Sequence, residues 1–409
     1  MPAGEVSPNA LSVPGFRRVW VGATVSAAGD AASWVALVAL SLRSTHASLP
    51  LLVVSYTAPV AVGGLGAGWA LDRFDRRGLM ILDSLVRGAA FASIPLTALF
   101  GQLGAAHLYT VAVVYGLLRM IGLAGFPSLI PVLVSEAQLD QANALEGASF
   151  GLASLAGAAF AGLAVATIGP ALVVAFDAAS YLVMALALWS LGDLRAKTAQ
   201  PNEHHPRMPS SASFRAVVRL AFTNPVLRDT TIMFALFNVG EGALLVFLPH
   251  RALDLGLGSG GYGFLVAATT GGELLAALFL AWHTWRPPLR ASITFAQLAA
   301  ATAVLLLVVR STATTVIGLV ALGLCAAPMT AWAQSLRMRL VAAEAHGRLF
   351  ALLRTTMQAT PPVGAALAAT TLSRGALTTV IAIVLVMGVP AVLLGHNLIS
   401  TPLAIDHRA

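Results

Sequence analysis

Long apolar runs alternate with short polar connections along almost the whole chain. An α-helix needs about 20 consecutive apolar residues to cross the hydrocarbon core of a bilayer. Runs of this length predict twelve membrane-spanning helices, at residues 19–42, 49–71, 79–100, 107–131, 141–168, 171–191, 229–250, 262–282, 290–309, 315–333, 350–372 and 376–397. The pattern therefore predicts an all-α integral membrane protein.

A polar stretch at residues 192–228 divides these runs into two sets of six. Its basic residues and its prolines at 201, 206 and 209 favour a cytoplasmic linker. Residues 133–145 align without gaps on residues 340–352, and this offset predicts two pseudosymmetric halves with a central site at their interface. The expected organisation is an N-terminal arm, a first half, the linker, a second half and a tail, at residues 1–18, 19–191, 192–228, 229–397 and 398–409.

Composition agrees with a membrane class. Hydrophobic residues occupy 58% of the 409 positions and charged residues 10%, against roughly 25% charged residues in a soluble domain. A net charge of +7 would in a soluble protein indicate an anionic partner such as nucleic acid. Here the arginines fall mostly between the apolar runs, so we interpret them as a topology signal and expect no nucleic-acid partner.

The basic residues also predict orientation. With the N-terminus in the cytoplasm, 17 Arg and Lys residues lie in cytoplasmic segments and four lie outside, which places both termini inside. The first run is too long for the core of a signal peptide and is expected to remain as a helix. Arginine outnumbers lysine 23 to 1, a bias typical of GC-rich bacterial genomes, so the expected location is a bacterial cytoplasmic membrane.

The loop at residues 68–77 reads Gly-Trp-Ala-Leu-Asp-Arg-Phe-Asp-Arg-Arg and concentrates five charges in six positions. Each charge would cost about 3 kcal/mol at the bilayer centre, so this segment is predicted to be a turn at the membrane surface. The loop resembles the motif between the second and third helices of the major facilitator superfamily, approximately Gly-x-x-x-Asp-Arg-x-Gly-Arg-Arg. Asp75 stands where that motif has glycine.

Other segments narrow the resemblance. Phe-Arg-Arg-Val-Trp at 16–20, Gly-Asp at 29–30 and Gln-Ala-Asn-Ala-Leu at 141–145 are together similar to the branch that includes macrolide-efflux and siderophore-exporting proteins. The segment that begins at Arg119 resembles the fourth-helix motif of drug–proton antiporters, whereas Ala158 replaces the proline of their fifth-helix motif. The resemblance implies proton-coupled efflux of an amphiphilic or cationic small molecule by rocking of two halves about a central cavity.

Acidic residues within the apolar runs are the candidate coupling groups, because an ionised carboxylate at low dielectric must find a partner or take up a proton. Asp30 and Glu241 each follow a glycine, at an offset of 211 that agrees with the repeat. Glu273 is the third candidate, and Arg119 is the candidate counter-charge that releases the proton when substrate leaves. The alternatives are a solvated acid without a coupling role, and an arginine that pairs structurally with Asp30 or with backbone carbonyls.

Four further charges within the runs are interpreted as structural. Asp83 and Arg87 lie four residues apart, on one face of the third predicted helix, and are expected to pair. Glu146 and Asp177 have no partner that the sequence reveals.

The resemblance also implies a cytoplasmic gate. Asp72 would dock at the N-terminal end of the eleventh helix, near residues 347–350, where free N–H groups and about half a positive charge are exposed. Arg76 would reach both Asp72 and Glu136. The expected gate residues are Gly68, Asp72, Arg73, Arg76, Arg77 and Glu136. The alternative is that the arginines only fix the orientation of the chain.

The sequence lacks a phosphate-binding Gly-x-x-x-x-Gly-Lys loop, so we expect an ion gradient rather than ATP to supply energy. Cys325 is the single cysteine, and the nine histidines lack paired metal-ligand spacing, so neither a metal nor a cofactor is expected. The chain is not expected to be an enzyme. Expected partners are a small-molecule substrate, protons and membrane lipids, with the chain acting as a monomer. A metabolite uniporter or importer of the same fold, or a lipid scramblase, remains the alternative.

Overall fold

The computed structural model describes residues 9–192, 219–220, 222–258, 260–282, 288–340, 353, 356–357 and 359–400. Within these residues every regular element is a helix and no strand is present. The prediction of an all-α protein is therefore confirmed.

The helices follow the order of the predicted apolar runs. The elements before the polar stretch are η1 (Ala10–Ser12), α1 (Pro14–Arg43), α2 (Leu49–Arg73), α3 (Arg76–Leu99), α4 (Ala105–Leu133), η2 (Glu136–Gln138), α5 (Leu139–Thr167) and α6 (Pro170–Trp189). Those after it are α9 (Pro225–Asp254), α10 (Gly261–Trp282), α11 (Leu289–Ala303), η3 (Val304–Val308), α12 (Thr312–Leu340), α14 (Pro361–Leu372) and α15 (Ala376–Ser400).

Ten helices in the described part of the chain are long and apolar enough to cross a membrane. In addition, α2 contains a shorter apolar segment, Leu49–Gly64. The expected eleventh span, 350–372, lies partly outside the described residues. The total of twelve spans therefore stays a prediction.

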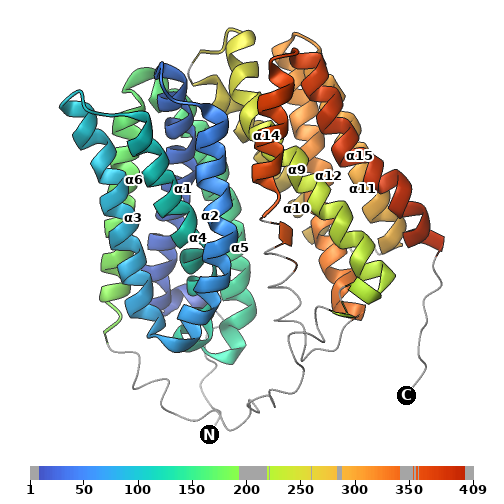
Figure 1. Ribbon diagram of the computed structural model, residues 1–409. Coiled ribbons are helices and arrows are strands. Elements are labelled where there is room, and N and C mark those ends of the chain that lie inside the picture. Colours follow the sequence, from blue (N-terminus) through green and yellow to red (C-terminus); the bar gives the residue numbers. More distant parts are fainter. Residues whose placement is uncertain are drawn as a thin grey trace, which may run out of the picture. The chain divides into compact units, whose positions relative to one another are not determined.

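The chain divides into two compact units. The first comprises Met1–Pro206 and Leu248–Thr270, and the second comprises Arg207–Phe247 and Gly271–Ala409. In the first unit α1 packs against α5 and α6, α3 packs against α6, and α2 packs against α4; these helices stand side by side in blue to green in Figure 1. In the second unit α11 packs against α12 and α15.

A very short connection joins α2 to α3. Because α2 ends at Arg73 and α3 begins at Arg76, only Phe74 and Asp75 lie between them. The Asp75 carboxylate accepts a hydrogen bond from the backbone N–H of Gly78 at 2.7 Å, which is the usual contact of a helix N-cap. The predicted tight turn is present, and the acid that replaces the glycine of the motif caps α3.

Glycines bring helix backbones together in the first unit. A Cβ atom at Gly157 of α5 would collide with the backbone of Ala28 in α1, and one at Gly116 of α4 would collide with the backbone of Tyr56 in α2. Lipid tails are as apolar as leucine side chains, so helices in a bilayer associate through such close van der Waals contacts rather than through hydrophobic burial. These two glycines therefore hold α5 on α1 and α4 on α2.

A buried amide ties three helices of the second unit together. Gln297 of α11 donates through Nε2 to the backbone oxygen of Met233 in α9 at 3.1 Å and to that of Met387 in α15 at 2.8 Å. A Cβ atom at Gly242 of α9 would collide with Pro361 of α14. The second unit thus combines interhelical hydrogen bonds with glycine contacts, as membrane helix bundles do.

Replacing Gly157 with leucine is expected to destabilise the first unit, because the new side chain has to displace the α1 backbone. Overpacking of this kind costs about 1–3 kcal/mol. The measurement is the apparent Tm of the purified protein in detergent. Gly151→Leu on the same helix is the matched control, because a Cβ atom there meets no atom within 4 Å. Equal losses in the two variants would contradict the assigned contact.

Candidate functional site

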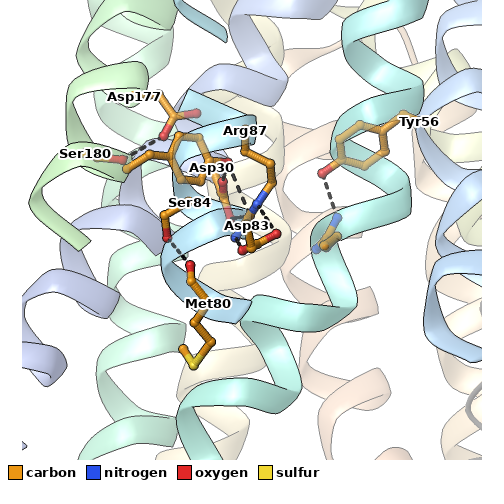
Figure 2. A network of polar contacts seen from close by, with 10 residues as sticks. Asp30, Tyr56, Met80, Asp83, Ser84, Arg87, Asp177 and Ser180 are labelled. Atoms are coloured by element: carbon orange, nitrogen blue, oxygen red, sulfur yellow. Dashed lines mark hydrogen bonds and ion pairs between the residues drawn. The ribbon is translucent and has the colours of Figure 1, made fainter. Parts of the chain in front are cut away.

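Asp83 and Arg87 of α3 form the centre of a polar cluster inside the first unit (Figure 2). Arg87 donates through Nε to Asp83 Oδ1 at 3.0 Å, and its Nη2 donates to Asp83 Oδ2. Both side chains are buried. The predicted pairing is confirmed, and its two-point geometry makes it stronger than an ion pair with one contact.

The same guanidinium connects α3 to α1 and α6. Arg87 Nη1 lies 3.9 Å from Asp30 Oδ2 and donates a hydrogen bond to the Tyr181 hydroxyl at 3.4 Å. That hydroxyl in turn donates to Asp30. Cζ of Arg87 lies 4.7 Å from the centre of the Tyr181 ring, within the range of a cation–π contact. Asp30 therefore shares a cation that Asp83 holds more tightly.

Arg119 of α4 belongs to the same region but has different partners. Its Nη1 donates to the Tyr56 hydroxyl at 2.6 Å. Its Cζ lies 5.5 Å from the ring centre of Tyr56 and 5.9 Å from that of Tyr115. Among the described residues Arg119 forms no ion pair with a carboxylate. The hydrogen-bond partner found for Arg119 is thus a tyrosine hydroxyl.

An aromatic chain extends from these charges. The rings of Tyr56 and Tyr115 stack with their centres 4.9 Å apart. Trp34 of α1 lies against Tyr56, with ring centres 4.3 Å apart, and its indole Nε1 donates to the Tyr262 hydroxyl of α10 at 2.7 Å. Including Tyr181, four of the five tyrosines in the chain belong to this region.

A cavity of about 70 Å³ lies against the cluster within the first unit. Its lining includes the charged residues Asp30, Asp83, Arg87, Arg119 and Glu146 and the apolar residues Met80, Phe126, Phe150 and Met184. The Asp30 side chain is 26% exposed, whereas that of Asp83 is 1% exposed. The volume can hold water but is far below the ~300 Å³ that a drug-sized ligand requires. Within the cluster, Asp30 is the carboxylate that water in this cavity reaches most readily.

Asp177 of α6 is a further buried acid of the first unit, drawn near Asp30 in Figure 2. The Ser180 hydroxyl donates to its Oδ1 at 2.9 Å. The carboxylate packs against Gly29 of α1, where a Cβ atom would collide with it. The glycine that precedes Asp30 therefore makes room for a second acid.

Glu241 and Glu273 belong to the second unit. Glu241 lies on α9 and Glu273 on α10, and their carboxyl groups are close enough to interact electrostatically. A Cβ atom at Gly240 would meet the side chain of Met387 in α15. The predicted coupling residues thus form two groups, with Asp30 and Arg119 in the first unit and the two glutamates in the second.

The structure places part of the predicted gate. Arg76 donates to the backbone oxygen of Ser128 in α4 at 3.1 Å. Arg77 donates to the backbone oxygens of Leu188 and Trp189, both at 2.8 Å. These carbonyls belong to the last turn of α6, where the helix dipole favours a cation. Arg77 therefore joins the start of α3 to the end of α6.

The remaining gate contacts are not settled. Gly68 and Asp72 lie in the last turns of α2, Arg73 ends that helix, and Glu136 begins η2. The side chain of Asp72 and residues 347–350 lie outside the described part of the chain. The docking of Asp72 and its network with Arg76 and Glu136 stay predictions.

Residues 4–402 match the family model described as a transmembrane secretion effector. The chain belongs to this major facilitator family. It is accordingly a multi-pass membrane transporter and not an enzyme, as the sequence motifs predicted.

Bacterial members of the superfamily are similar to this transporter along the chain. The uncharacterised MFS-type transporter y4rN of Sinorhizobium fredii is 26% identical over 97% of this chain and 98% of its own length. The multidrug efflux pump Tap of Mycobacterium tuberculosis is 31% identical over 67% of each chain. The enterobactin exporter EntS of Citrobacter koseri is 26% identical over 65% of this chain and 62% of its own length.

Solved transporters share the fold. The nucleoside transporter NupG superposes with a TM-score of 0.72 at 11% identity, over 94% of this chain and 99% of that one. A peptide transporter of the POT type gives a TM-score of 0.75 at 14% identity, over 93% of both chains. At such identities the likeness establishes the fold alone. The predicted major facilitator fold is confirmed.

The sequence placed Asp83 and Arg87 outside the candidate site and gave no tyrosine a hydrogen-bonding role in it. The spacing of the ion pair was recognised, but nothing in one helix reveals that α1 presents Asp30 to the same guanidinium. The tyrosines offered a signal, because only five occur in the chain and most of them fall within apolar runs. A buried tyrosine hydroxyl usually has a hydrogen-bond partner. In this transporter three of those partners are charged residues, namely Asp30, Arg87 and Arg119.

Arg87→Met is expected to destabilise the transporter strongly, because it leaves Asp83 buried without its cation, a loss of about 3–5 kcal/mol. The double variant Asp83→Asn with Arg87→Met removes both charges and is expected to recover much of that loss. The apparent Tm of each variant in detergent measures the effect. A double variant no more stable than Arg87→Met would contradict the pairing as the cause.

Proposed function

We propose that this transporter exports an amphiphilic or cationic small molecule in exchange for protons by alternating access of two six-helix halves. The observation that carries the proposal is Asp30, an intramembrane carboxylate that is open to a cavity and has only a shared cation. Relatives named as a multidrug efflux pump and as an enterobactin exporter support the outward direction.

The arrangement around Asp30 suits a group that gains and loses a proton. Asp83 holds Arg87 through two contacts, so neutralising Asp30 leaves the guanidinium paired. Asp30 in turn keeps the hydrogen bond from Tyr181 when it is ionised. The charge on Asp30 can therefore change without leaving another buried charge unpartnered, which would be costly in a membrane interior.

Arg119 supplies a second positive charge on the cavity wall. Its hydrogen bond to Tyr56 and its two aromatic contacts hold it in place without neutralising it. A fixed cation on the same cavity wall as Asp30 opposes a bound cationic substrate. Arg119 is therefore proposed as the group that links substrate release to deprotonation.

The remaining assignments extend this proposal. The transporter acts as a monomer in a bacterial cytoplasmic membrane, with both termini and the stretch at 192–228 in the cytoplasm. The loop at 68–77 gates the cytoplasmic side. Small molecules, protons and lipids are its partners, and nucleic acid is not.

Transport by purified protein in lipid vesicles tests the function. A panel of labelled amphiphilic cations is offered with an imposed pH gradient, and the measurement is repeated after a protonophore has collapsed the gradient. Accumulation that requires the gradient is expected. Movement that only follows the substrate gradient would favour the uniporter or importer, and movement of labelled lipid without a substrate would favour the scramblase.

Asp30→Asn and Glu241→Gln are each expected to abolish accumulation against a gradient while downhill exchange continues, because each removes a carboxyl group that can exchange a proton. Asp254→Asn is the matched control, since Asp254 is exposed at the end of α9. Normal accumulation by both Asp30→Asn and Glu241→Gln would refute these coupling sites.

Arg119→Ala is expected to reduce transport more than Arg119→Lys, because lysine keeps the positive charge on the cavity wall. Tyr56→Phe removes the hydroxyl that accepts from Arg119 but keeps the ring, so a smaller loss is expected. Initial rates of gradient-driven accumulation provide the comparison. If the alanine variant matched the parent protein, Arg119 would have no part in coupling.

A further inference from the structure

Asp177 is an acid of α6 that the proposed coupling does not use. The residue is 1% exposed, and the Ser180 hydroxyl donates a hydrogen bond to its Oδ1 at 2.9 Å. The Ser33 hydroxyl of α1 also lies close to the carboxyl group. Oδ2 is buried and has no hydrogen-bond partner among the residues that the structure describes. The ion pairs found in the described part of the chain do not include Asp177.

The helices packed against α6 bring further charges towards this carboxyl group. From α1 it meets Asp30, with which it interacts electrostatically, and the Gly29 backbone against which it packs. From α3 it meets Arg87, which Asp83 already holds. Tyr181 of α6 directs its hydroxyl to Asp30. From α5, Glu146 lies on the cavity wall. Asp177 thus lies near a carboxylate, and no cation among the described residues forms an ion pair with it.

Electrostatics then limits the states that the two acids can adopt. A buried carboxylate that forms no ion pair and has only serine hydroxyls beside it is strongly disfavoured in its ionised form. A second negative charge next to it makes that form still less favourable. Both acids cannot readily be ionised at once. Asp30 has the hydrogen bond from Tyr181 and a share of Arg87, so a negative charge is better accommodated on Asp30 than on Asp177.

We propose that Asp177 is a further proton-binding residue of the transport cycle, in addition to Asp30 and Glu241, and that it holds a proton whenever the neighbouring Asp30 is ionised. The proton on Asp177 forms an ordinary carboxylic O–H bond, and it leaves only when Asp30 has taken up a proton of its own from the cavity. The charge on one acid therefore determines whether the other keeps its proton. The part of this proposal that concerns transport rests on proton-coupled export.

The protonation state can be measured without transport. Infrared difference spectra between the parent protein and Asp177→Asn, both in lipid vesicles at neutral pH, are expected to contain the C=O stretching band of one protonated carboxylic acid. Asn has nearly the shape of a neutral Asp, so this variant is expected to fold. Ser180→Ala, which keeps the acid but removes its hydrogen bond, should shift the band and not abolish it. If the difference spectrum contained carboxylate bands instead, Asp177 would be ionised and the proposal would be overturned.

Coupling is tested by the pH profile of downhill substrate exchange. The pH profile of the parent protein is expected to differ from that of Asp177→Asn, because the variant lacks the proton that Asp177 carries while Glu241 and the other acids are unchanged. A profile that Asp177→Asn leaves unchanged would reduce Asp177 to a permanently neutral packing residue and overturn its role in the cycle. If Asp177→Asn does not reach the membrane, the difference spectrum between the parent protein and Ser180→Ala replaces it, because loss of the Ser180 hydroxyl shifts the C=O band of a protonated Asp177 and leaves carboxylate bands if Asp177 is ionised.

Failure of this proposal can be distinguished from failure of proton-coupled export. A parent protein whose accumulation does not depend on the pH gradient refutes the export mechanism, whatever the infrared band shows. Gradient-driven accumulation by the parent, combined with carboxylate bands in the difference spectrum, retains the export mechanism and refutes the role of Asp177.

Discussion

Arg87 is the residue on which the polar interior of the first unit depends, because its one positive charge is divided among three helices. Asp83 binds it from its own helix, Asp30 approaches it from α1, and Tyr181 contacts it from α6. Charges in a membrane interior are tolerated when they are paired in this way. The supply of cation limits how many acids can be ionised. The region contains more carboxyl groups than cations that pair with them. This excess of acids makes the region suitable for exchanging protons.

Helix packing and the chemistry of the cluster are linked through the smallest side chains. At Gly29 the α1 backbone lies against the Asp177 carboxylate, and one residue later the same helix presents Asp30 to Arg87. A larger residue at Gly29 would move α6 and so separate the two acids. In this transporter the glycines that allow close approach in lipid also set the distances between charged groups.

Apolar runs predicted the helices, since burial in lipid requires a continuous stretch of apolar residues and their lengths are fixed by bilayer thickness. The spacing of Asp83 and Arg87 predicted their pairing, because residues four apart share a helix face. The contacts of Arg87 with Asp30 and Tyr181 could not be predicted in the same way. Helices that are apolar on all sides carry little information about which face meets which neighbour. The capping role of Asp75 also required the structure, since it depends on where α3 begins.

Phe74 and Asp75 form a short, stiff connection between α2 and α3. With helix on both sides and the Asp75 carboxylate fixing the first turn, few backbone torsions are free to absorb a displacement. A shift at the end of α2 is therefore transmitted to α3, which moves as a rigid helix. Asp83 lies about two turns from the start of α3 and Arg87 about three. A displacement of the connection between α2 and α3 therefore also displaces the buried ion pair. The surface loop is in this way mechanically coupled to the buried charges.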